Sequence, residues 1–314
     1  MSAPLPRVRG VALLAAVLVV ALAAVLVAGL LDRGVLGQAR ALQHGRAAQA
    51  VALQQGLELW AARILRDDAA RDGVDAVGDA WSQPMPPLPL PEGMAHGRLR
   101  ELDGCLNLNA LWSGGQPDAL AMARFERLLR VLELDPRLLD AVVDWLDEDD
   151  LGRAGGGEEA TYAALEPPRR AANGPFVHVG ELALVAGVDA ASLQRLLPHV
   201  CAHPGSDTRI NVNTATVPVL MALDEAIGPA VARRLHRDGR ARHASSADFL
   251  AAVERELGRP PPPQLAQGID VRSRHFLAEI LIVQAQVPVR LYSLLDREPG
   301  TGTVRVVARS LGRW

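Results

Sequence analysis

Hydrophobic residues fill the start of the chain and then recur at helical spacing. Residues 11–31 read VALLAAVLVVALAAVLVAGLL and carry no charge. A helix of that length spans about 30 Å, the hydrocarbon thickness of a bilayer. Apolar residues such as Leu57, Trp60 and Ile64 then recur near helical spacing to about Arg71. The pattern predicts one long helix, with a membrane span at 11–31 and an amphipathic outer half whose apolar stripe must be covered.

The rest of the chain combines helix-like and strand-like patterns. Five prolines in residues 82–93 exclude a helix or a central strand and predict a linker or surface loop. Alternating leucines around Gly104 predict two short strands, whereas residues 117–202 have helical periodicity and helix start signals. Two further helices are predicted to meet at residues 227–229. From Arg274 onward, apolar and polar residues alternate as in two or three antiparallel strands.

Strands before and after a helical block predict an α+β fold. We expect a small antiparallel sheet packed on the long helix, with a large α-helical domain inserted between the strands. The predicted divisions are a leader at 1–10, a transmembrane segment at 11–31, a helix-and-sheet part at 32–112 and 274–314, and an inserted α-domain at 113–273 with a second helical subdomain from about residue 206.

Composition and motifs argue against an enzyme. The net charge is −3 and all 33 basic residues are arginine, so no overall basic field attracts nucleic acid. The chain lacks G-x-S-x-G, H-E-x-x-H and P-loop motifs. Of eight histidines, only His199 and His203 have a ligand-like i, i+4 spacing, and no third ligand is evident. We interpret the histidines as surface or loop residues.

The amino terminus indicates where the chain resides. Two arginines in MSAPLPRVRG precede the apolar run, which predicts a cytoplasmic amino terminus and a body outside the inner membrane. The alternative is a cleaved signal peptide, but the apolar run is longer than is usual for one. Cys105 and Cys201 are either one disulfide or two buried thiols, and their number favours neither.

Seven carboxylates crowd around three consecutive glycines in DWLDEDDLGRAGGGEEATY, residues 144–162. Counted from Asp147, Asp149 stands third, Gly152 sixth and Glu158 twelfth, as in an EF-hand loop. The fifth position is leucine, so a complete EF-hand is not expected. A calcium loop of related geometry is favoured over a solvated acidic loop, because glycines let the backbone wrap around a hard cation.

The predicted helix pair in INVNTATVPVLMALDEAIGPAVARRL resembles the helix-hairpin-helix units of DNA-binding proteins, including competence receptors. Between Gly205 and Arg259 there are eight arginines and seven acids, a net charge of only +1. Such a small charge is a weak basis for binding phosphates. A packed helix pair is therefore favoured, and a membrane-anchored DNA-binding protein of the competence type remains the alternative function.

An ordered set of motifs resembles the type II secretion minor pseudopilin K family over nearly the whole chain. The motifs are the RG leader before VALL, then DGCLNLN, DWLDEDD, GGEEATY, ANGPFVHVGEL, LLPHV and INVNTATVPVLMAL. The resemblance implies a pilin-like helix and sheet with an inserted α-domain. It also implies a calcium site formed by Asp147, Asp149, Glu158 and Glu159, where the family more often has aspartate at the last position.

The same resemblance implies processing, location and partners. A prepilin peptidase would cut after Gly10 and leave Val11 as an N-methylated first residue, while Ala15 replaces the glutamate that most pseudopilins carry. The chain would then be a single-pass protein of the bacterial inner membrane, mostly periplasmic, where a Cys105–Cys201 disulfide is conceivable. It would join minor pseudopilins I and J and other subunits at the pseudopilus tip, to initiate or cap assembly during export, with no nucleic acid as partner. The apolar stripe near Leu53, Leu57, Trp60 and Ile64 would be partly interfacial.

Overall fold

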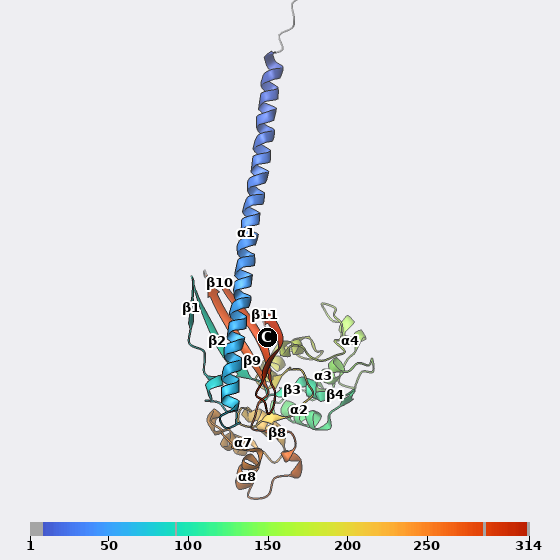
Figure 1. Cartoon of the computed structure of the whole chain (residues 1–314). Coiled ribbons are helices and arrows are strands. Elements are labelled where there is room, and N and C mark those ends of the chain that lie inside the picture. The colour runs from blue at the N-terminus through green and yellow to red at the C-terminus, as the bar shows by residue number, and fades with distance from the viewer. Residues whose placement is uncertain (1–8, 92, 285–286, 313–314) are drawn as a thin grey trace, which may run out of the picture. The chain divides into compact units, whose positions relative to one another are not determined.

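The computed structural model describes residues 9–91, 93–284 and 287–312 and divides the chain into two compact units, Met1–Gln55 and Gly56–Trp314 (Figure 1). Helix α1 (Arg9–Ala69) begins in the first unit and ends in the second. One long helix ending close to Arg71 was predicted, and this prediction is confirmed.

The first unit contains the predicted membrane span. Among the residues that the structure describes, no helix has the length and apolar content needed to cross a membrane. Leader residues 1–8 lie outside the described residues, and so do the side chains of residues 11, 12 and 28–31 of the predicted span. The membrane span at 11–31 is therefore not confirmed.

A five-stranded antiparallel sheet forms the framework of the second unit. The α+β class and the antiparallel sheet are confirmed, and the tail supplies three strands. The proline-rich segment is more than a loop, because it contains an edge strand, a position where a missing N–H is tolerated. In spatial order the strands are β1 (Leu88–Leu90), β2 (Gly93–Glu101), β9 (His275–Gln284), β10 (Val287–Arg297) and β11 (Val304–Leu311).

The end of α1 packs on this sheet through its apolar side. Ala61 and Leu65 are fully buried in a cluster with Phe276 of β9 and Leu295 of β10. Leu57 is only 6% exposed. The prediction that the stripe near Leu53, Leu57, Trp60 and Ile64 is partly interfacial is therefore wrong for Leu57, which the protein's own core covers, whereas the other three residues are only partly buried.

One buried carboxylate on the same side, Glu58, sets the position of the helix on the sheet. Glu58 is buried, accepts a hydrogen bond from Ser293 Oγ at 2.6 Å, and pairs with Arg309 at 2.7 Å. The two partners lie on β10 and β11, so sliding the helix by one residue would leave a buried carboxylate without partners.

In the sequence, the helical block is inserted between β2 and β9. These two strands lie side by side in the sheet (Figure 1). The block has one continuous apolar core. Residues 117–202 are helical only in parts, because glycine- and proline-rich loops separate the helices. The α-helices of the whole block are α2 (Ala119–Val131), α3 (Leu138–Leu146), α4 (Glu159–Ala163), α5 (Ala190–Leu196), α6 (Val217–Leu223), α7 (Pro229–His236) and α8 (Ser246–Leu257).

Local sequence explains where several of these helices start. Asp118 accepts a hydrogen bond from Ala121 N at 2.8 Å and caps α2, and Thr216 and Ser245 cap α6 and α8. Gly228 precedes α7, whose first residue is Pro229. The predicted meeting point of two helices at 227–229 is confirmed.

Short strand pairs tie the block together. The strand predicted after Gly104 is only two residues long and leads into a 3-10 turn. The pairs are β3 (Leu106–Asn107) with β6 (Val200–Cys201), parallel; β4 (Trp112–Ser113) with β5 (Gln116–Pro117), antiparallel; and β7 (Ile210–Asn211) with β8 (Ile269–Asp270), parallel.

Candidate functional site

The acidic loop connects the end of α3 to the start of α4. Asp147 directly follows α3, and Glu158 directly precedes α4. One carboxylate oxygen each of Asp147, Asp149 and Glu158 lies within 4.8 Å of the other two. Three of the four predicted calcium ligands thus converge.

Three carboxylate oxygens of this group lack a hydrogen-bond partner in the part of the chain that the structure describes. Among the described residues, Asp147 Oδ1 and both carboxylate oxygens of Glu158 are buried and have no hydrogen-bond partner. Burial, together with the nearby charges of Asp144 and Asp147, raises the pKa of Glu158 to about 7. Burying unpaired carboxylate oxygens next to other negative charges lowers the stability of the folded chain unless a cation neutralises the charge. The donor set therefore fits a hard cation such as calcium.

Two residues that the sequence reading did not assign organise this loop. Asp144 is completely buried and accepts hydrogen bonds from Arg153 N at 2.9 Å and Arg153 Nη1 at 2.6 Å. The same Nη1 contacts Asp147 Oδ2 at 2.5 Å. Arg153 thus already neutralises one side of the cluster. A single arginine inside a run of acids is a signal that could have indicated this role.

The glycines of the loop are needed for close approach. A Cβ atom on Gly156 would lie 2.0 Å from Asp144 Oδ2, which is far inside contact distance. At Gly155 a Cβ would lie 2.8 Å from the side chain of Arg137. The loop can therefore lie against α3 only where it has no side chains.

Glu159 is not brought to the other three residues. Its side chain is exposed and lies 3.8 Å from Arg170. Glu159 is the first residue of α4 and lies outside the converging group to which its neighbour Glu158 belongs.

Cys105 and Cys201 meet beside the parallel pair of β3 and β6. The structure joins them in a disulfide, with Cα atoms 5.8 Å apart. This bridge links the chain just after β2 to the end of the first helical part. Gly10 and Val11 lie in α1, and the side chain of Val11 is outside those described.

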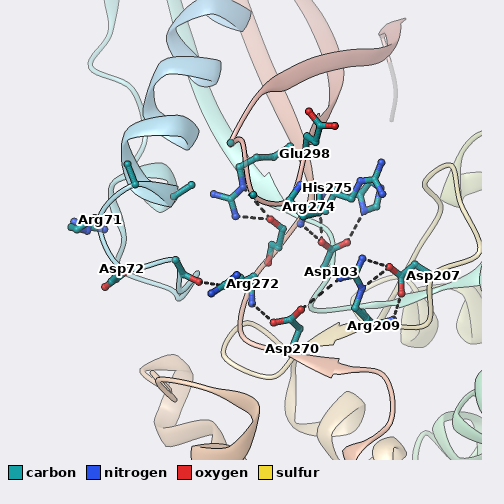
Figure 2. Close-up of a pocket in the computed structure, with 18 of the residues that line it drawn as sticks. Arg71, Asp72, Asp103, Asp207, Arg209, Asp270, Arg272, Arg274, His275 and Glu298 are labelled. Atoms are coloured by element: carbon teal, nitrogen blue, oxygen red, sulfur yellow. Dashed lines mark hydrogen bonds and ion pairs between the residues drawn. The ribbon is translucent and has the colours of Figure 1, made fainter.

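A second cluster lies in a cavity of about 500 Å³ (Figure 2). Asp103, His203 and His275 line it and are all buried. The interpretation of the histidines as surface or loop residues is wrong for His275, which begins β9 and is 6% exposed. His203 does lie in a loop, but it is only 4% exposed. Charged side chains of both signs line the same cavity, among them Arg71, Asp72, Asp207, Arg209, Asp270, Arg272, Arg274, Arg297 and Glu298.

Comparisons with known proteins agree on one family. Two family models described as type II secretion system (T2SS), protein K, match residues 104–205 and 210–272. The chain is 34% identical to the type II secretion system protein K of Pseudomonas aeruginosa, covering 97% of this chain and 93% of that protein. It is 32% identical to the protein K of Klebsiella pneumoniae, covering 94% of each.

A solved structure resembles the fold. It is the crystal structure of the GspK–GspI–GspJ complex from the enterotoxigenic Escherichia coli type 2 secretion system. The TM-score is 0.75 at 26% sequence identity, and the match covers 88% of this chain and all of the matched chain.

Proposed function

Because the chain belongs to the type II secretion system protein K family, we propose that it acts as the minor pseudopilin K of a secretion pseudopilus. It is a structural subunit of the export machinery rather than an enzyme. The observation that carries this proposal is similarity over 97% of the chain to a protein K, at 34% identity. The predicted helix-hairpin-helix unit lies within residues 210–272, which the family model itself matches, so it needs no DNA-binding role.

The partners we propose are minor pseudopilins I and J, in a complex at the tip of the filament. The structure with a TM-score of 0.75 is a complex of GspK with GspI and GspJ, which supports this assembly. A large helical block inserted into the pilin-like sheet would fit at the end of a filament but not inside its packed shaft.

The second unit offers one face of α1 for such contacts. Leu57 and Leu59 are two residues apart, which places them on nearly opposite sides of a helix. Leu57 is buried, whereas Leu59 is 73% exposed. Arg63 and Asp67 continue the exposed side, with side chains 83% and 70% exposed. We assign this exposed side of α1 to the neighbouring subunits.

This assignment predicts different outcomes for two leucines of one helix. Leu59→Glu should leave the full chain folded and weaken its co-purification with I and J, because it puts a charge in the interface only. Leu57→Glu should unfold the chain, because it buries a charge in the core. Circular dichroism reports folding, and co-purification reports assembly. A folded Leu59→Glu chain that binds I and J like wild type would show that this side is not the interface.

Two finer features complete the proposal. Residues 11–31 anchor the chain in the inner membrane, with the bulk in the periplasm, and a prepilin peptidase removes the leader after Gly10. The support is the uncharged run of 21 residues that follows the arginines of the leader.

The acidic loop would hold calcium through Asp147, Asp149 and Glu158. The unpartnered buried oxygens of Asp147 and Glu158 support this role. A bound cation would offset the carboxylate repulsion and tie the glycine loop to α3 and α4.

A further inference from the structure

We propose that Asp103, His203 and His275 form a second metal site, selective for a transition metal of the zinc class, on the wall of the cavity. This site is separate from the acidic loop and shares no residue with it. The proposal rests on the geometry of these three side chains and does not depend on the assignment to the secretion pseudopilus.

The three ligand atoms already lie together. His275 Nδ1 is 2.8 Å from Asp103 Oδ1, and His203 Nε2 is 3.6 Å from the same oxygen. All three ligand atoms lie within 4.8 Å of one another. The distance of 3.6 Å is too long for a hydrogen bond. A carboxylate accepts hydrogen bonds and does not donate them, so in the tautomer with its hydrogen on Nδ1 the lone pair of His203 Nε2 is available to a metal ion between the two atoms.

The protein holds these side chains in place from three directions. Asp103 follows β2 and His275 begins β9, where Asp103 Oδ2 accepts hydrogen bonds from the backbone N–H groups of Arg274 and, at 3.1 Å, of His275. His203 follows β6 and is held by Asn107, whose Oδ1 accepts from His203 N at 3.2 Å. Such outer contacts orient the ligands of metal sites.

The disulfide strengthens this arrangement. Cys105 lies two residues after Asp103, and Cys201 lies two residues before His203. The bridge therefore fixes the two chain segments that carry one carboxylate and one imidazole ligand. These ligands come from segments about 100 residues apart, and the bridge lowers the entropy cost of bringing them together.

The ligand types select the metal. Two imidazoles and one carboxylate suit Zn²⁺, Co²⁺ or Ni²⁺, whereas Ca²⁺ prefers oxygen ligands alone. The cavity adjoins all three residues and gives water or a small anion access to a fourth position.

One rearrangement accompanies binding. The rings of His203 and His275 are stacked, with centroids 3.8 Å apart and planes 17° from parallel. Lone pairs in parallel planes do not converge on one ion, so the rings must splay apart when a metal binds. If Nδ1 of His275 donates its hydrogen to Asp103, this hydrogen passes to water when the metal binds at Nδ1, and Nε2 takes up a hydrogen from water, so the ring stays neutral.

The test uses the full chain stripped of metal with EDTA and then saturated with calcium, so that the acidic loop is filled. Zn²⁺ is titrated and counted by mass spectrometry of the metal, and Co²⁺ is added as a coloured substitute. We expect one Zn²⁺ per chain at micromolar concentration and an intense visible Co²⁺ spectrum typical of four-coordinate nitrogen and oxygen ligands. His203→Gln should weaken Zn²⁺ binding by at least about tenfold.

Matched variants locate the ion. His199→Gln changes the other member of the i, i+4 pair, whose Nδ1 contacts Thr216 instead, and should leave Zn²⁺ binding unchanged. Glu158→Ala should also leave it unchanged, because it alters only the acidic loop. No stoichiometric Zn²⁺, a weak octahedral Co²⁺ spectrum, or binding that survives His203→Gln but is lost in Glu158→Ala would each overturn the proposal. The Co²⁺ spectrum is measured on wild type, so the test stands even if a variant fails to fold.

Discussion

At the residue scale, the acidic loop is a balance between one arginine and several carboxylates. Arg153 pairs with Asp144 and Asp147, but the oxygens of Glu158 have no partner among the described residues. The uncompensated charge is thus concentrated at Glu158. This residue therefore decides how much a bound cation stabilises the fold.

The loop predicts a measurable response to calcium. Calcium should raise the melting temperature of the full chain, and at a hundredfold excess over its Kd it should contribute about 2.7 kcal/mol. Asp149→Ala together with Glu158→Ala should abolish that rise. Glu148→Ala is the control, because Glu148 is acidic and exposed in the same loop but outside the converging group. Equal melting of wild type with calcium and with a chelator would mean that the loop is only solvated.

A second residue-scale prediction concerns Asp68 at the end of α1. Burial, and then the charges of Asp79 and Asp75, raise the pKa of Asp68 from 3.8 to about 6. The folded chain therefore binds a proton there more tightly than the unfolded chain does, and stability falls as the pH rises from about 4 to 6. Asp68→Asn should remove this loss and gain at most about 3 kcal/mol at pH 7, since one pKa unit is worth about 1.4 kcal/mol.

Denaturant unfolding of wild type and Asp68→Asn at pH 4 and pH 7 checks this. The two chains should differ little at pH 4 and clearly at pH 7. Asp67→Asn is the control, because Asp67 is exposed and should not change the pH dependence. A variant that is destabilised equally at both pH values would show that the contact of Asp68 with Arg71 at 2.5 Å matters more than the repulsion.

The two candidate sites differ in how far the sequence could predict them. Asp147, Asp149 and Glu158 lie within one short loop, so their spacing alone indicated a common site. Asp103, His203 and His275 are distant in sequence and meet because β3 pairs with β6 and β9 pairs with β2. No local pattern encodes that pairing, and so the spacing of His199 and His203 pointed to the wrong partner.

At the scale of elements, the hydrophobic pattern predicted which segments fold but not which face each covers. The three C-terminal strands and the helix pair at 227–229 followed from alternation and from Gly228-Pro229. The side of α1 that faces the sheet did not, because a helical stripe looks the same whether the chain's own sheet or another subunit covers it. Edge strand β1 was missed because its one proline, Pro89, is compatible only with an edge strand, and the sequence does not reveal which strand lies at an edge.

The bridge between Cys105 and Cys201 gives the element-scale prediction. It closes a loop with a sequence separation of 96 residues and links β6 to the turn before β3. Replacing both cysteines with serine should lower the free energy of unfolding by about 2–4 kcal/mol, because the unfolded chain regains freedom. Chemical denaturation measures this, and reduced wild type is the matched control, since it should lose a similar amount. Two reactive thiols in unreduced, unfolded protein would contradict the bridge.

At the scale of the whole molecule, the inserted block is compatible with the sheet because its two ends are adjacent. Glu101, the last residue of β2, pairs with Phe276 near the start of β9. A long insertion between neighbouring strand ends leaves every backbone hydrogen bond of the sheet intact. The sequence order of strands, helices and strands was therefore enough to predict the insertion.

The last prediction concerns the start of the mature chain. If the chain is a pseudopilin, the protein purified from membranes should begin at Val11 with a methylated amine, because Gly10 directly precedes the uncharged run. Its intact mass should lack residues 1–10 and include one methyl group.

Gly10→Val is the test variant, since a branched side chain at the cleavage position should block the peptidase and retain the leader. Leu5→Val, inside the leader, is the control and should be processed normally. A wild-type chain that still starts at Met1 in cells with an active peptidase would contradict the anchoring and processing we propose. It would leave the sheet, the helical block and both proposed metal sites untouched, because every residue that forms them lies in the second unit.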